Sequence, residues 1–237
     1  MQELLRGAGA VCIYFVVAAS TMLTLRWFIH IPDELFRKLL HGILLVSYIP
    51  FLFAFDTWYL AAGLALALEV LIYPALAWAE HLSAFSAFVN ERKHGEFKHS
   101  LLLAFTMLAV CICVCWGWLG DKYLVLACMY AWGVGDAFAA LVGKAYGKHK
   151  IRWRFADRKK SVEGSAAMLL TSTGAVVIIL LLRGGMGFGS CLLVSLAGAA
   201  AATLMELVSR GGRDTVTCPL AAMTVILPLV AWLGGFA

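Results

Sequence analysis

Long apolar segments separated by short polar stretches run the length of this 237-residue chain. An α-helix needs about 20 apolar residues to cross a bilayer, and in lipid only helices and closed barrels satisfy every backbone polar group. The pattern therefore predicts an all-α, polytopic membrane helical bundle with about eight transmembrane helices, or seven if one short segment does not cross. The expected spans are residues 8–29, 39–55, 57–79, 99–119, 122–142, 164–182, 189–209 and 215–235.

Composition strengthens this class assignment. Hydrophobic residues make up 62% of the chain and charged residues 14%, whereas an ordinary soluble domain has about 45–50% and 25%. Little length remains beyond membrane helices and short loops, so we expect one integral-membrane domain over residues 1–237. The second span is short and its connection to the third, around Asp56 and Thr57, is tight, so a re-entrant arrangement stays open there.

The basic residues are distributed unevenly between the two sides of the predicted bundle. Eight spans place sixteen of the nineteen Lys and Arg residues on one side. Cytoplasmic loops carry an excess of Lys and Arg, so the rich side is predicted to be cytoplasmic and both termini to lie on the opposite side. The poor side carries Arg6, Lys122 and Arg183.

Asp136 is the most informative residue, because it lies inside the apolar fifth segment in the sequence W-G-V-G-D-A. A charge in a membrane segment is costly and indicates function by default. Small residues recur at every fourth position beside it, at Gly135, Ala139, Gly143 and Gly147. Such a face lets membrane helices pack closely. Packing would bury Asp136, which then needs a cation, either Mg²⁺ or one of the lysines that follow.

A basic loop follows the fifth segment. For residues 150–158, an orientation signal that also contacts anionic lipid heads explains the amount of charge. The two edges of the loop, Gly147-Lys148 and Lys160-Ser161, favour phosphate binding, because Ser161 precedes a helix whose free N–H groups attract anions. The basic residues of the loop are Lys144, Lys148, Lys150, Arg152, Arg154, Arg158, Lys159 and Lys160.

Other acids lie near the same predicted membrane face. Glu163 in the first turn of the sixth helix is either a functional carboxylate or a group that stabilises the helix start. Asp214 is either a metal ligand or the N-cap of the last helix. Glu206 lies in an Ala-rich helix, where a carboxylate has no simple structural role. Glu69 lies deeper, in the third helix, and is explained by ion passage or by a hydrogen-bonded pair.

Arg37, Lys38 and His41 form a polar group near the start of the second helix. Residues three and four apart share a helix face, so these side chains can point the same way. Anchoring at the membrane interface and contact with an anionic ligand both fit this arrangement.

Several motifs occur together in one order between about Glu34 and Pro219. They are R-K-x-x-H from Arg37, G-E at Gly95, W-G-x-G-D-A from Trp132, G-x-x-x-G-K from Gly143, K-S-x-E-G-S from Lys160, and Glu206 followed by D-T at Asp214. This set resembles the family of CTP-dependent lipid kinases that includes dolichol kinase, phytol kinase and the yeast type of diacylglycerol kinase. One position differs from the family's pattern: this chain has Thr215 where the family tends to have Asn.

The resemblance implies a Mg²⁺-dependent transfer of the γ-phosphate of CTP to the hydroxyl of a lipid alcohol. The alcohol would be a polyprenol or dolichol, a phytol-like alcohol or diacylglycerol. The implied partners are CTP, the membrane lipid alcohol and the bilayer, with no nucleic acid; the oligomeric state is left open. The implied roles are catalysis by Asp136, Glu163 and His41, CTP binding by Arg37, Lys38, Gly143, Gly147, Lys148, Lys160, Ser161 and Ser165, and metal binding by Asp136, Glu206 and Asp214.

Two other functions remain open from the sequence. The family resembles the phosphatidate cytidylyltransferases more distantly, although the long K-R…K-D…G-G…D-R-x-D signature of those enzymes is missing from this chain. An ion-coupled transporter with Glu69 and Asp136 as intramembrane sites is the second alternative. Against transport, the charged groups cluster at one membrane face and no inverted repeat of broken helices is found.

Overall fold

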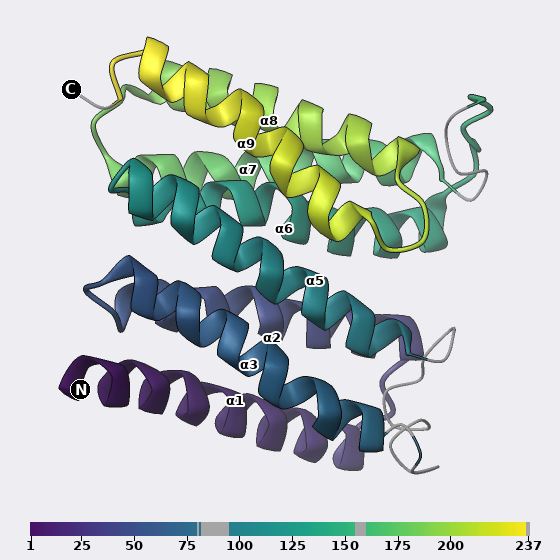
Figure 1. The fold of residues 1–237 in the computed structure, drawn as a ribbon. Helices are drawn as coiled ribbons and strands as arrows, with labels where there is room; N and C mark the ends of the chain where they lie inside the picture. Colours follow the sequence, from purple (N-terminus) through teal and green to yellow (C-terminus); the bar gives the residue numbers. More distant parts are fainter. Residues whose placement is uncertain (80, 82–94, 155–159, 236–237) are drawn as a thin grey trace. The chain divides into compact units, whose positions relative to one another are not determined.

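The computed structural model describes residues 1–79, 81, 95–154 and 160–235. Within this part the chain is helical and has no β-strand, apart from an isolated bridge between Lys150 and Ser161. Eight helices are long and apolar enough to cross a membrane (Figure 1). The prediction of an all-α membrane bundle with eight spans is therefore confirmed.

The helix bounds agree with the predicted spans to within a few residues at most ends. The largest differences are in the first two helices, which begin at Gln2 and Asp33, each well before its predicted start at residue 8 or 39. The first turns of both helices carry charged residues, so an apolar window misses them. The helices are α1 Gln2–Phe28, α2 Asp33–Phe53, α3 Trp58–Ala79, α5 Glu96–Cys111, the π-helix η1 Ile112–Trp118, α6 Lys122–Tyr146, α7 Val162–Arg183, α8 Phe188–Val208 and α9 Asp214–Trp232.

The chain forms two compact units, Met1–Gly120 and Asp121–Ala237. In the first unit α1 packs on α2, and α5 with η1 packs on α3. The core of this unit is aromatic: the ring of Phe105 contacts those of Phe15 and Phe51. The tight α2–α3 connection is held by Glu3, whose carboxylate accepts hydrogen bonds from the backbone N–H groups of Asp56 (2.9 Å) and Thr57 (2.8 Å).

Glu69 also belongs to the first unit, where it connects two helices. The hydroxyl of Thr106 on α5 donates a hydrogen bond to Glu69 Oε2 at 2.9 Å. This contact favours the hydrogen-bonded pair over ion passage as the explanation of this acid.

In the second unit α6 packs along α7, α7 on α8, α8 on α9, and α9 on α6 (Figure 1). The small-residue face of α6 makes the closest approach to α7. A Cβ atom at Gly135 would lie 2.2 Å from Ser172 Oγ, and one at Gly164 of α7 would lie 2.9 Å from the carbonyl oxygen of Ala139. The predicted role of the small residues in helix packing is therefore confirmed.

The end of the second unit at which α6 begins is held by a largely buried ion pair. Asp121 caps α6 by accepting hydrogen bonds from Tyr123 N (2.9 Å) and Leu124 N (3.2 Å). The same carboxylate pairs with Arg183, the last residue of α7, whose guanidinium also donates to the carbonyl oxygen of Gly235. The start of α6, the end of α7 and the C-terminal turn are thereby tied together.

Candidate functional site

The other end of the second unit is where α6 and α8 finish and where α7 and α9 begin. There the ammonium group of Lys160 donates a hydrogen bond to Glu206 Oε1, between residues 46 positions apart. Glu206 lies in the last turn of α8 and its side chain is only 4% exposed, while that of Lys160 is 25% exposed. A buried carboxylate is costly unless a cation is close, and Lys160 supplies that cation.

Asp136 of α6 and Asp214 of α9 belong to the same electrostatic neighbourhood. Burial lowers the pKa of Lys160, but the charge and hydrogen bond of Glu206 and the charges of Asp136 and Asp214 raise it by more, so that it lies above its ordinary value. Lys160 therefore stays protonated at neutral pH. We call these four residues the Lys160 cluster. The structure thus brings together four residues that the sequence had singled out.

The donor chemistry of the Lys160 cluster suits Mg²⁺. All three acids offer carboxylate oxygens, and Mg²⁺ typically uses one or two carboxylates, several waters and the phosphates of a substrate. Among the residues that the structure describes, no group of three or more His, Cys, Asp or Glu side chains is arranged to hold a metal ion. A metal here would therefore need further ligands, such as water or phosphate oxygens.

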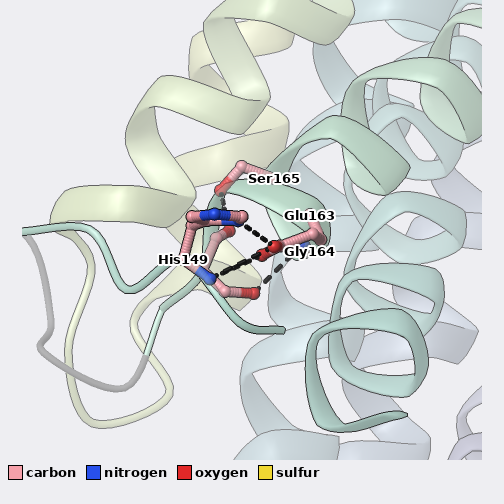
Figure 2. A network of polar contacts seen from close by, with 5 residues as sticks. His149, Glu163, Gly164 and Ser165 are labelled. Atoms are coloured by element: carbon pink, nitrogen blue, oxygen red, sulfur yellow. Dashed lines mark hydrogen bonds and ion pairs between the residues drawn. The ribbon is translucent and has the colours of Figure 1, made fainter. Parts of the chain in front are cut away.

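The start of α7 is stabilised by its own serines. Ser161 is the N-cap, and its hydroxyl oxygen accepts a hydrogen bond from the N–H group of Gly164 at 3.2 Å. The hydroxyl of Ser165 donates to the carbonyl oxygen of Ser161 at 3.1 Å (Figure 2). Both hydroxyls, which the sequence assigned to CTP binding, therefore have a structural role at the helix N-terminus.

Glu163 contacts the basic loop. Figure 2 shows its carboxylate facing His149, with Glu163 Oε1 2.6 Å from His149 Nδ1. The backbone N–H of His149 also donates to both oxygens of Glu163, at 3.1 and 3.3 Å. A carboxylate in a first helical turn is favoured by the helix dipole. Glu163 therefore holds the start of the loop against the start of α7.

Backbone hydrogen bonds complete this attachment of the loop. The N–H of Val162 donates to the carbonyl oxygen of His149 at 2.9 Å, and the N–H of Ile151 donates to that of Lys160 at 3.1 Å. These bonds pair the two edges of the loop in antiparallel fashion. Lys160 is thus fixed at its backbone, immediately before the helix start. The loop residues Arg158 and Lys159 lie outside the described residues.

The glycines predicted to bind CTP lie against the start of α7. Gly147 is the C-cap of α6, and a Cβ atom on it would lie 2.1 Å from the carbonyl oxygen of Gly143 and 2.7 Å from Ser161 Oγ. A Cβ atom on Gly143 would make ordinary contact with Ser161 and Gly164. Lys148 follows as an exposed side chain. Close helix packing alone thus explains the glycine at 147.

Asp214 is not the N-cap of α9, so this structural alternative is wrong. It is the first residue of the helix, and the preceding Arg213 occupies the N-cap position without a side-chain cap. As an acid in the first turn it is still favoured by the helix dipole. Thr215 beside it is buried.

Arg37, Lys38 and His41 lie in the early turns of α2, in the first unit, and all three are partly buried. The guanidinium of Arg37 pairs with Glu34 Oε1 at 2.5 Å. The sequence analysis missed the roles of Glu34 and His149. The spacing of three residues between Glu34 and Arg37 on a helix was a usable signal, whereas nothing in the sequence links His149 with Glu163.

Comparison with known proteins supports the family suggested by the motifs. A phytol kinase of Synechocystis sp. is 36% identical over 107 residues, which are 45% of this chain and 41% of that kinase. Part of the chain is thus similar to a lipid alcohol kinase. Dolichol kinase EVAN of Arabidopsis thaliana is 28% identical over 193 residues, 76% of this chain and 33% of that kinase. The chain spans less than half the length of each of these two kinases.

These two names correspond to two of the three activities in the family that the motifs resemble, so the resemblance is confirmed at the level of sequence. No protein-family model and no solved structure matches the chain. The eight long apolar helices of the described residues support an integral, multi-pass membrane protein.

Proposed function

We propose that this protein is a membrane kinase that transfers the γ-phosphate of CTP to the hydroxyl of a lipid alcohol. The substrate would be a polyprenol or dolichol, a phytol-like alcohol or diacylglycerol. One observation carries the proposal: in a chain related to a phytol kinase and a dolichol kinase, Lys160 contacts Glu206 within the electrostatic reach of Asp136 and Asp214. These four residues come from separate motifs and share one end of the second unit.

The chemistry asks the protein mainly for positioning and charge neutralisation. The bond between the γ-phosphorus and the bridging oxygen of CTP breaks, CDP leaves, and the lipid oxygen forms the new bond to phosphorus. The proton of the lipid hydroxyl passes to a carboxylate of the Lys160 cluster. Lys148 and Lys160 would bind the triphosphate as cations.

Asp136, Glu206 and Asp214 would hold Mg²⁺, which neutralises phosphate charge when bound. Gly143, Gly147, Ser161 and Ser165 would bind CTP indirectly, by setting the path of the loop between α6 and α7. Glu163 would hold the same loop through His149, which makes it a positioning residue instead of the catalytic group expected from the sequence.

The membrane setting suits an amphipathic substrate. A lipid tail would lie among the apolar helices, while its hydroxyl would reach the polar end of the second unit. The excess of Lys and Arg at the polar end of the second unit supports a cytoplasmic location for that end, where CTP is available.

Labelled nucleotides test this proposal directly. The purified protein is incubated with Mg²⁺ and either γ-labelled or α-labelled CTP, together with a panel of lipid alcohols or with phosphatidate. We expect the γ-label in the lipid and no α-label, and labelled ATP in a parallel series tests the choice of donor. Transfer of the α-label would favour a cytidylyltransferase instead, and absence of both labels from the lipid would contradict the kinase.

A further inference from the structure

The contact between Lys160 and Glu206 has a second consequence, which rests on the proposed function. We propose that Lys160 is the resident counter-ion of the carboxylates and leaves Glu206 for a nucleotide phosphate when the divalent cation binds. One side chain would then serve two partners in turn, and the binding of metal and nucleotide would be coupled through it.

Burial makes the first partner necessary. The side chain of Glu206 is 4% exposed and lies in α8, so its carboxylate is shielded from water. Removal of the Lys160 ammonium would leave the buried carboxylate of Glu206 uncompensated, which is costly. While the ammonium of Lys160 lies against Oε1, its positive charge opposes the binding of a metal ion to that oxygen.

Charge and tether make the exchange feasible. Three carboxylates share the neighbourhood of one ammonium, so the cluster retains an excess of negative charge that favours a divalent cation. Glu206 is fixed in a helix, whereas Lys160 ends in a compact charge on a flexible four-carbon stem. Its backbone immediately precedes the N-cap of α7. The ammonium can therefore move to a phosphate while the backbone stays in place.

The exchange predicts reciprocal coupling between the two ligands. Without nucleotide, a metal ion must displace Lys160 and binds weakly. A triphosphate gives Lys160 a new partner, so nucleotide raises metal affinity and metal raises nucleotide affinity by the same factor.

Titration with Mn²⁺, followed by electron paramagnetic resonance without nucleotide, tests the competition. Lys160→Met should bind Mn²⁺ about tenfold more tightly than wild type, because a cation in direct contact with a ligand shifts its affinity for protons by one or more powers of ten. Arg152→Met is the matched control, since it removes one charge from an exposed position of the same loop. Equal or weaker binding by Lys160→Met, relative to this control, would overturn the proposal.

A measurement on the wild-type protein covers the case in which Lys160→Met does not fold. Acetylation of lysines by a soluble ester is followed by mass spectrometry, with and without saturating Mn²⁺. The metal should increase the labelling of Lys160 severalfold and leave that of exposed Lys150 unchanged. Unchanged or reduced labelling of Lys160 would overturn the exchange.

A titration in the presence of CTP separates this inference from the proposed function. If CTP promotes Mn²⁺ binding in wild type but not in Asp136→Asn, the result supports the proposed metal site. The role of Lys160 is then decided by the titrations of Lys160→Met and Arg152→Met without nucleotide. If CTP promotes no Mn²⁺ binding in either protein, the proposed function and the exchange both fail.

Discussion

At the scale of single residues, charges that are costly in a membrane were the most reliable guides. Asp136 and Glu206 stand out in the sequence because nothing in an apolar helix explains a carboxylate. The structure places both in the electrostatic neighbourhood of Lys160. The contact of His149 with Glu163 was not predictable, because a loop conformation sets it and no helical spacing relates the two positions.

Glu163 gives a prediction at this scale. Glu163→Ala removes the acceptor of the His149 backbone N–H and the partner of its ring, so the edge of the loop should open more often. Hydrogen exchange at the His149 amide is then expected to become faster by about tenfold, because a hydrogen bond to a charged acceptor is stronger than one to a neutral acceptor.

His149→Ala is the matched variant for this experiment. It keeps the backbone contact with Glu163 and removes only the ring, so its amide should exchange at a rate between those of wild type and Glu163→Ala. Unaltered exchange at residue 149 in Glu163→Ala would show that the carboxylate does not hold the loop.

At the scale of elements, apolar periodicity located the helices but misjudged the ends that carry charges. The predicted start of α2 was late because Asp33, Glu34, Arg37 and Lys38 interrupt the apolar run, although acids in a first turn favour a helix. The close packing of α6 against another helix was easier to predict, because small residues at every fourth position form a face that lets membrane helices approach closely.

The contact between these two helices is tested by adding a single methyl group. Gly164→Ala places a Cβ atom 2.9 Å from the carbonyl oxygen of Ala139 on the neighbouring helix. Because backbone must move to admit it, we expect a lower free energy of unfolding by about 1–3 kcal/mol, measured in detergent. Gly174→Ala on the same helix meets no atom within 4 Å, and its stability should equal or exceed that of wild type.

Two ion pairs of different burial offer a second comparison between elements. Arg183 and Asp121 are 9% and 13% exposed, whereas Arg6 and Asp56 are 60% and 78% exposed. Arg183→Met leaves a largely buried carboxylate unpaired and should lower the free energy of unfolding by about 3 kcal/mol. Arg6→Met should lower it by less than about 1 kcal/mol. Equal effects in thermal unfolding would refute the structural role of the buried pair.

At the scale of the whole molecule, the sequence predicted the class and the number of spans because bilayer thickness dictates both. It also placed Asp136, Glu163, Glu206 and Asp214 at one membrane face, and the structure has them at one end of the second unit. Which groups pair there depends on side-chain packing that one sequence does not reveal. The ion pair between Lys160 and Glu206 is the clearest example of a contact that the sequence did not predict.

The orientation in the membrane is a prediction for the whole chain. The excess of Lys and Arg puts the loop between α6 and α7 in the cytoplasm and the C-terminus on the opposite side. A reporter that is active only outside the cytoplasm should therefore be active when fused after residue 237. A cytoplasmic C-terminus would overturn the predicted topology.

Phosphate transfer by Asp136→Asn is the most direct test of the kinase site. This substitution keeps the shape of the side chain and removes the charge, so the protein should remain inserted and folded. Transfer of the γ-label from CTP to a lipid alcohol should fall by about a hundredfold or more, which is the effect of removing one electrostatic stabiliser from an active site. Glu69→Gln, in the first unit, should retain activity. Full activity in Asp136→Asn would contradict the account.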